Sequence, residues 1–248
     1  MLHPPAGGRA PRAGVMPPTP SSPTPALLSR HKTHWQRCCR SCQGKLRAAR
    51  SDWEAARKRG LAALSELSNT LITASAIAEG GDADGDALER IAQSHASLGD
   101  LRSAALDALR RDAADQSARV GDALRDAEAA LEGFREARDA LAREANDPTL
   151  TTPAAREACT RLKATQAVFW SAPPRRYLTD VDRVVQTFER ELAVKAAVAA
   201  FLREAADAFA APGGPTPPQT AANGAALRDA LNVHVVVWML EPESDDAG

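Results

Sequence analysis

The sequence predicts an all-α fold, an elongated helical bundle of about five or six helices with coiled-coil-like seams. The 44% of hydrophobic residues are largely alanine and leucine, with five Phe, four Trp and one Tyr. Such small or straight side chains lose little rotamer freedom in a helix. Apolar residues also recur at three- and four-residue spacing over long stretches. With 248 residues, the chain is long enough to bury one sizeable core, which we place in a single domain over 27–242.

The two ends of the chain have the composition of unfolded segments. Residues 1–26 are rich in Pro, Gly and Ser and lack acidic residues, so they bury too little apolar surface to offset their ordering entropy. We expect a disordered leader there and a solvated acidic tail over 243–248. A basic, acid-poor leader is also typical of an organelle transit peptide, so organelle targeting is the alternative for it.

The first helical region covers 27–78. Leu61, Leu64, Leu67 and Leu71 follow three- and four-residue spacing, which places them on one buried face. The region forms one long helix or two helices in series. A break would fall at its glycines, Gly44 and Gly60, because glycine costs about 1 kcal/mol relative to alanine in a helix.

The next region, 86–145, is predicted to be a helical hairpin or one long helix. Its apolar residues follow the alternating repeat of a seam, meaning a stripe along which two helices wind together. The seam consists of Val120, Leu124, Ala127, Leu131, Phe134 and Leu141. Arg138 is the one seam position of the wrong character.

Prolines mark the helix starts in 153–210. Thr152 before Pro153 supplies a capping oxygen and a helical φ angle, and Pro173–Pro174 opens the next helix. That helix carries a second seam, consisting of Leu178, Val181, Val185, Phe188, Leu192, Ala199, Leu202, Ala206 and Phe209. The last element, 224–240, is valine-rich as strands are, but no other strand exists to pair with it, so we predict a buried helix.

Charge is distributed unevenly along the chain. Residues 30–60 contain ten Lys/Arg against Asp52 and Glu54, a net charge of +8, whereas the chain after Gly60 has 19 basic and 30 acidic residues, a net charge of −11. The basic segment is a solvated surface, a nuclear import signal, or a contact for RNA or an acidic partner. Because no aromatic residues interleave with the charges, we expect RNA contact without sequence specificity. The candidate RNA or anion contacts are Arg57, Lys58 and Arg59.

The cysteines are not spaced as in a secreted disulfide scaffold, which indicates a reducing compartment. Cys38, Cys39 and Cys42 lie together near His31 and His34, which are zinc-ligand residue types, while Cys159 stands alone. The spacing of Cys38 and Cys42 is one helical turn rather than that of a zinc knuckle, so we expect no metal site. Neighbouring Arg37 and Arg40 are expected to lower the pKa of these thiols and make them prone to oxidation.

No stretch of the sequence predicts catalysis or a cofactor. The segment EGGDADGD lacks the lysine of a phosphate loop, and none of the histidines lies in a nucleophile elbow. Carboxylates in RDAEAALEGFREARDALARE alternate with arginines at helical spacing, a pattern typical of exposed ion pairs. We therefore expect no enzyme. No apolar run reaches the length of about 18 residues that a membrane-spanning helix needs.

Four segments carry a resemblance to a known family. Trp53 followed by Leu64, Ser65, Leu67, Ser68 and Asn69 resembles the amino-terminal helix of the AIRIM family, small helical ribosome maturation factors that work with a AAA ATPase. GDLRSAALDALRRD with EGFREARDAL is similar to its middle region. YLTDVDRVVQTFERELAVKAAV is similar to its penultimate helix and LRDALNVHVVVWMLEPE to its carboxyl terminus. The matches cover roughly residues 45 to 242.

The resemblance implies a non-enzymatic adaptor subunit in maturation of the large ribosomal subunit, acting in the cytoplasm and nucleus. It implies as partners a type II AAA ATPase, a second small helical subunit and precursors of the large ribosomal subunit. The alternative is a structural coiled-coil or helical-bundle assembly protein without an ATPase partner. We expect Trp170 to be an exposed aromatic residue available to a partner. The candidate partner-binding or packing face consists of Trp53, Leu64, Leu67, Leu71, Val181, Val185, Phe188 and Leu192.

Overall fold

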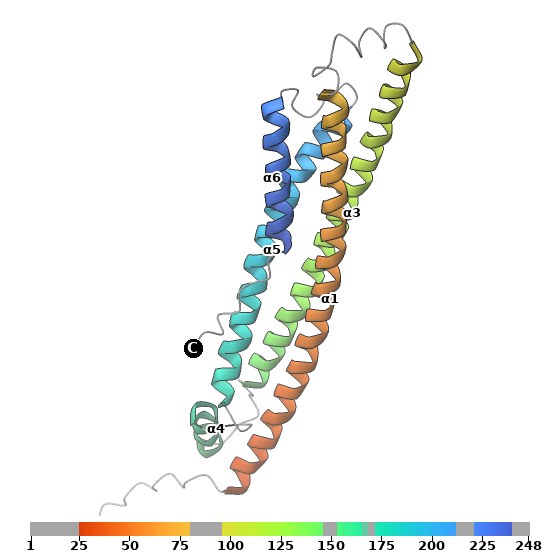
Figure 1. Ribbon diagram of the computed structural model, residues 1–248. Coiled ribbons are helices and arrows are strands. Elements are labelled where there is room, and N and C mark those ends of the chain that lie inside the picture. Colours follow the sequence, from red (N-terminus) through yellow and green to blue (C-terminus); the bar gives the residue numbers. More distant parts are fainter. Residues whose placement is uncertain are drawn as a thin grey trace, which may run out of the picture. The chain divides into compact units, whose positions relative to one another are not determined.

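The computed structural model describes residues 25–79, 96–145, 153–165, 167, 172–211 and 221–239. The regular elements over these residues are all helices, which confirms the all-α prediction (Figure 1). They are α1 (Pro25–Glu79), α3 (Ala96–Ala145), α4 (Pro153–Thr165), α5 (Pro174–Ala210) and α6 (Ala221–Met239). The predicted acidic tail and nearly all of the predicted leader lie outside the described residues. None of the described helices is long and apolar enough to cross a membrane.

The chain forms two compact units, whereas the sequence predicted a single domain over 27–242. The smaller unit comprises Met1–Gln36 and Asp147–Arg175, and the larger comprises Arg37–Asn146 and Arg176–Gly248. The short helix α4 lies in the smaller unit and begins at Pro153, while α1 and α5 each contribute their first residues to the smaller unit and the rest to the larger one. Among the described residues of the smaller unit, the buried side chains are Trp35, Cys159, Leu162, Ala172 and Pro174.

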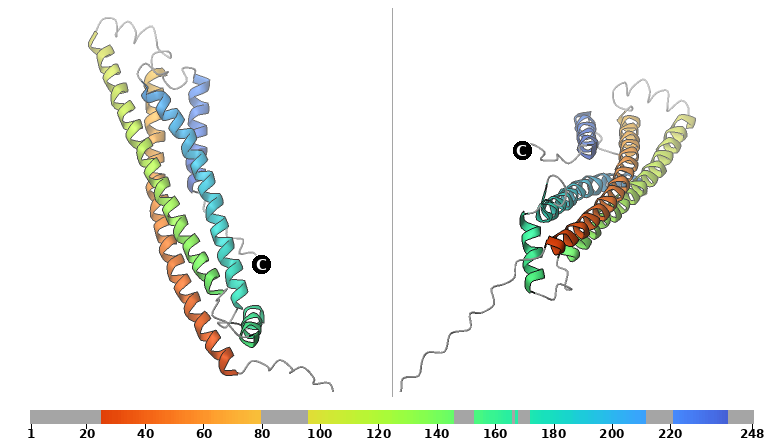
Figure 2. Two further views of the ribbon diagram at one scale, coloured as in Figure 1. Left: turned by 180° about the vertical axis from the view of Figure 1, so that it is seen from behind. Right: turned by 90° about the horizontal axis from the view of Figure 1, so that it is seen from below.

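The larger unit is a helical bundle. Its part of α1, then α3, α5 and α6 lie side by side, and helices that follow one another in the chain run in opposite directions (Figures 1 and 2). The shorter α6 covers only the half of this unit that contains the carboxyl-terminal half of α5. One half of the larger unit is therefore built from four packed helices and the other half from three.

The core of the larger unit consists of two clusters that follow this change in thickness. The four-helix cluster joins all four helices and contains Ala63, Leu64, Leu67, Leu71, Ala74, Ala113, Val120, Val198, Ala199, Leu202, Ala206, Phe209, Leu231 and Trp238. The three-helix cluster joins α1, α3 and α5 and contains Ala49, Trp53, Ala56, Ala127, Ala130, Leu131, Phe134 and Val185. Residues of both predicted seams occur in these clusters, so the seams pack within one chain.

Helix α1 is continuous through both glycines at which a break was considered. Gly44 is exposed, whereas Gly60 is buried under the indole of Trp238, and a Cβ at position 60 would overlap that ring. Glycine at position 60 therefore serves the close approach of α6 rather than a bend in α1. Helix α3 is likewise unbroken from Ala96 to Ala145, which corresponds to the long-helix alternative over the described part of 86–145.

The valine-rich carboxyl-terminal segment is helical, as predicted, but the prediction that it is buried is wrong for one side of it. Leu231 and Trp238 are fully buried, whereas Val233 and Val236 are 58% and 53% exposed. Helix α6 contacts the bundle from one side, so its opposite face meets solvent. Helix α6 therefore carries more hydrophobic side chains than contacts within the chain bury.

Candidate functional site

The predicted partner-binding or packing face is a packing face. The ring of Trp53, 1% exposed, meets the ring of Phe188 edge-on at 4.9 Å, and Phe188 stacks on Phe134 at 4.4 Å. Of the other predicted members, Leu64, Leu67, Leu71, Val181 and Val185 are buried, and Leu192 is half-buried against the three-helix cluster. Trp170, expected to be an exposed aromatic residue, lies outside the described residues.

The three predicted anion contacts have different environments. Arg57 donates to Oε2 of Glu54 from Nε at 3.2 Å and from Nη2 at 2.9 Å, and it also donates from Nη1 to the backbone carbonyl of Met239 at 3.2 Å. Arg59 pairs with Asp126 on α3 at 2.7 Å. Lys58 is exposed. The guanidinium of Arg57 thus ties α1 to the end of α6 and is a structural group, which corrects its assignment as an anion contact.

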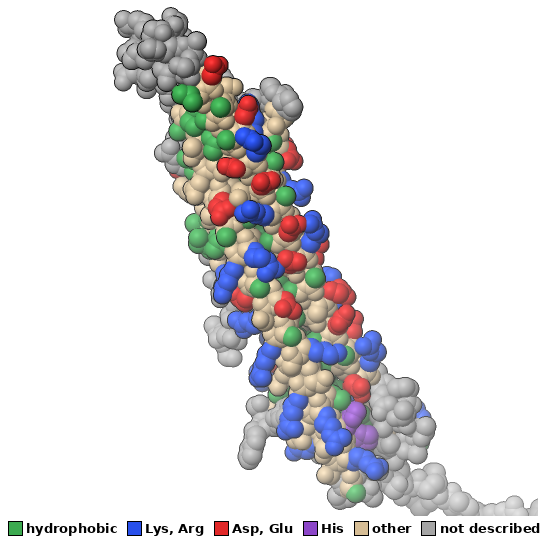
Figure 3. Space-filling model, turned by 90° about the vertical axis from the view of Figure 1, so that its right-hand side faces the viewer, with side chains coloured by type: hydrophobic (Ala, Val, Ile, Leu, Met, Phe, Trp, Pro, Cys, Tyr) green, Lys and Arg blue, Asp and Glu red, His purple; other side chains and the backbone are tan. Residues whose placement is uncertain are grey.

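Exposed basic side chains nevertheless gather over the first half of α1 (Figure 3). Farther along the molecule, acidic side chains alternate with the basic ones in the same view. The charge asymmetry of the sequence is therefore also an asymmetry of the surface.

A buried ion pair on α5 was not predicted from the sequence. Nζ of Lys195 lies 2.9 Å from Oε1 of Glu191, and the two side chains are 2% and 7% exposed. Nζ also donates to the backbone carbonyl of Trp238 at 2.8 Å and lies 5.2 Å from the centre of the Trp238 ring. Within the described residues, neither carboxylate oxygen of Glu191 has a hydrogen-bond partner of good geometry. The pair is therefore held by charge at short distance rather than by an aligned hydrogen bond.

These contacts hold the carboxyl-terminal end of α6 against the bundle. The last carbonyls of a helix have no partner within the helix and carry a partial negative charge. Lys195 and Arg57 donate to two of them, those of Trp238 and Met239. The indole Nε1 of Trp238 donates in turn to the backbone carbonyl of Arg57 at 3.2 Å. A lysine between the seam positions Leu192 and Ala199 was the sequence signal for this site.

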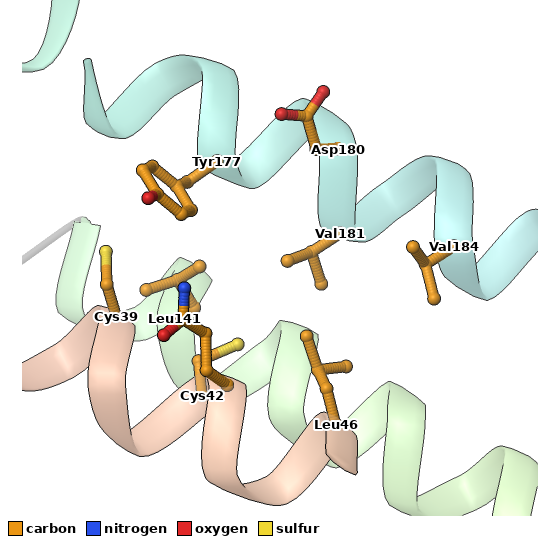
Figure 4. A pocket seen from close by; sticks show the side chains of 9 residues that line it. Cys39, Cys42, Leu46, Leu141, Tyr177, Asp180, Val181 and Val184 are labelled. Atoms are coloured by element: carbon orange, nitrogen blue, oxygen red, sulfur yellow. The ribbon is translucent and has the colours of Figure 1, made fainter. Parts of the chain in front are cut away.

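A small apolar pocket of about 200 Å³ lies between α1, α3 and α5 (Figure 4). It is lined by Cys39, Cys42, Gln43, Leu46, Leu141, Tyr177, Asp180, Val181 and Val184. Pockets for small molecules and cofactors usually measure about 300 to 1,000 Å³. The pocket is therefore smaller than the usual range for such sites.

The thiols around this pocket are less acidic than ordinary cysteines, so the prediction that neighbouring arginines lower their pKa is wrong. Burial, with smaller contributions from Cys42 and Cys38, raises the pKa of Cys39 to about 11. Burial raises the pKa of Cys42 more than Lys45 lowers it, and burial together with Glu144 raises that of Cys38. Arg37 and Arg40 are exposed on the outer side of the helix, where solvent screens them from the buried sulfur atoms.

We expect Cys39 to react slowly with alkylating agents in a protein whose other cysteines are replaced by alanine. With a pKa near 11 instead of 9.0, its thiolate population near neutral pH is about 100-fold lower than that of an ordinary cysteine. Iodoacetamide labelling against pH, and again in urea, measures this. Because folding raises this pKa, the folded state loses stability from Cys39 as the pH rises from 9.0 to about 11. A labelling midpoint at or below 9.0 would support activation by the arginines instead.

Large apolar side chains lie exposed on α5 and α6. We define the α5–α6 apolar face as Val194, Phe201, Val233, Val236 and Met239, whose exposed fractions lie between 42% and 58%. The ring of Phe201 lies 4.5 Å from that of His234, so the two helices meet at this face. Exposed apolar side chains on two helices that contact each other are a candidate protein interaction site.

Comparisons with protein-family models, with curated proteins and with solved structures give no match for this chain. The features that bear on function are those of the described residues: a packed bundle, a small apolar pocket, a basic helix face and an apolar helix face.

Proposed function

We propose that the protein is a non-enzymatic adaptor subunit of a AAA ATPase complex that acts in maturation of the large ribosomal subunit. The proposal combines the resemblance to the AIRIM family with the way in which the matching segments pack. It places the chemistry on the ATPase and assigns to this chain the positioning of that ATPase on its substrate.

The observation that carries the proposal is the convergence of the matching segments on the two core clusters. Trp53 from the first segment meets Phe188 from the penultimate one, and Phe188 stacks on Phe134 from the middle one. Leu64 and Leu67 share the four-helix cluster with Trp238 from the last segment. Segments far apart in a chain retain a common pattern when they pack on one another, and this supports reading the matches as one resemblance rather than as separate coincidences.

The α5–α6 apolar face supports the adaptor function because it offers a surface to a second helical subunit. We propose that an amphipathic helix of that subunit covers Val233 and Val236, which lie on the side of α6 opposite Trp238. Both predicted seams, by contrast, contribute to cores inside the larger unit. Seams packed within one chain are not available for assembly into a coiled-coil filament, so this packing favours the adaptor over the structural alternative.

Purification of the tagged protein from cells that express it tests the proposal. We expect co-recovery of a type II AAA ATPase, identified by mass spectrometry, together with precursors of the large ribosomal subunit. Depletion of the protein should delay large-subunit maturation. Recovery of homo-oligomers alone, or unchanged maturation after depletion, would refute the adaptor function.

Substitution of the α5–α6 apolar face tests the proposed site of the helical partner. We expect Val233→Glu with Val236→Glu to abolish recovery of the second subunit while the circular dichroism of the protein is unchanged, since both residues are exposed. Leu101→Glu is the matched control, because Leu101 is 64% exposed but lies on α3, outside this face. Equal loss of the partner in both variants would contradict the proposed site.

A further inference from the structure

The first half of α1 carries a straight row of cations on its outer side. At 100° per residue, Arg37, Arg40, Arg47 and Lys58 fall within an arc of about 80° on the side of α1 away from the buried positions Trp53 and Leu64, and all four are exposed. We call these four residues the basic stripe. At a rise of about 1.5 Å per residue, it extends for about 32 Å along a single continuous helix.

Within the described part of the chain, three of the four cations of the basic stripe have no carboxylate beside them. Among the described residues, no carboxylate lies within ion-pair distance of Arg37, Arg47 or Lys58. Arg57 and Arg59 differ from these residues, because each of them forms an ion pair with a carboxylate. Arg37, Arg47 and Lys58 therefore keep their positive charge available to a ligand.

The positions between these cations carry small side chains. Ser41, Gly44, Ala48, Ser51 and Ala55 are exposed small residues on this side of α1; the nearby carboxylates are Asp52, which is exposed, and Glu54, which pairs with Arg57. A protein partner is usually held by apolar or aromatic residues at the centre of its interface, and this surface has none. A bulky phosphate backbone can instead approach the helix closely between the cations. The same lack of aromatic side chains removes the means of stacking on bases.

The environment of α1 also disfavours a membrane surface as the ligand. A helix that lies on a bilayer buries its apolar face in the lipid. The apolar face of this part of α1, with Trp53 and Ala56, is buried in the three-helix cluster. Only the polar, cationic side of this part of α1 is exposed to a ligand.

We infer that the basic stripe binds the phosphate backbone of RNA without sequence specificity. The stripe itself indicates phosphate groups in a row, and the choice of RNA rests on the proposed function, which brings the protein to ribosomal precursors. This inference replaces Arg57, Lys58 and Arg59 as the anion contact with a different set, of which only Lys58 is shared.

Binding of the purified full-length chain to a fluorescently labelled RNA hairpin, measured by anisotropy over a range of KCl concentrations, tests the inference. The variant has Arg37, Arg40, Arg47 and Lys58 replaced by Gln. Each phosphate contact contributes about 0.7 to 0.9 to the slope of log K against log salt, so we expect the slope to become shallower by about 3. A second hairpin of unrelated sequence should bind the unsubstituted protein equally well.

The matched control replaces four exposed arginines of α3, Arg111, Arg119, Arg125 and Arg143, by Gln, which changes the net charge equally. It should keep the slope of the unsubstituted protein. Equal slopes for the two variants would overturn the inference. So would stripe-dependent binding of polyglutamate or of phosphatidylserine vesicles that is tighter than RNA binding at the same salt concentration, since it would assign the stripe to an acidic protein or a membrane. Recovery of the ATPase with the stripe variant tests the proposed function separately.

Discussion

Replacing Lys195 by methionine is expected to lower the free energy of unfolding by about 3 to 5 kcal/mol, the usual cost of breaking a buried ion pair. The substitution leaves the carboxylate of Glu191 buried without its cation and removes the hydrogen bond to the carbonyl of Trp238. Both losses fall at the contact between α5 and α6, so α6 should separate first. Urea denaturation followed by tryptophan fluorescence and by far-UV circular dichroism measures the change.

The control for this prediction removes both charges. Lys195→Met combined with Glu191→Leu should recover most of the lost stability, because a buried pair replaced by apolar residues of similar volume is often neutral or stabilising. Lys45→Met, at an exposed lysine on α1, should change stability by no more than about 0.5 kcal/mol. A Lys195 variant as stable as the Lys45 variant would contradict the role assigned to the pair.

Helix boundaries and seams could be predicted from the sequence because their causes are local. Proline fixes φ and lacks an amide hydrogen, so α4 and α5 begin at Pro153 and Pro174. Apolar spacing along a helix likewise determines which side chains share a face, whatever that face meets. For this reason most of the leucines of α1 and of the α3 seam were assigned correctly as buried positions, whereas Leu61 and Leu124 are half-buried against the four-helix cluster.

The partners of those faces could not be predicted, because they depend on contacts between distant segments. Arg57 reads as one more cation in a basic run, yet it binds the last carbonyl of α6. Arg37 and Arg40 are adjacent to the cysteines in the sequence, but helical rotation places them on the opposite side from the buried thiols. Sequence proximity thus gave the wrong direction for the thiol pKa, since burial outweighs a screened charge.

The candidate RNA contact illustrates the same limit. Net charge over 30–60 correctly indicated a basic surface on this part of α1, but three consecutive residues on a helix point in three directions about 100° apart. Arg57 and Arg59 consequently pair within the protein, whereas Lys58 is exposed without an ion pair among the described residues. Choosing cations three or four residues apart, instead of three consecutive ones, would have selected residues on one side of the helix, as in the basic stripe.

Alanine substitutions at the two glycines of α1 are expected to change stability in opposite directions. A Cβ at position 44 meets nothing within 4 Å, so Gly44→Ala should stabilise the protein by about 0.5 to 1 kcal/mol through helix propensity alone. A Cβ at position 60 overlaps Cζ2 of Trp238 and lies 3.3 Å from the Cβ of Ala123. Gly60→Ala gains the same propensity but overpacks the core, which should cost about 1 to 3 kcal/mol.

Trp238 cannot yield easily to the new methyl group, because its ring is 1% exposed and its Nε1 is bonded to the carbonyl of Arg57. Replacing this tryptophan with phenylalanine removes the ring atom that the methyl group would meet. Gly60→Ala should therefore cost less in a Trp238→Phe background than in the unsubstituted protein, a coupling that a double-mutant cycle of urea midpoints measures directly. Strictly additive effects would mean that α6 does not rest on Gly60, and the docking of α6 through Trp238 would have to be abandoned.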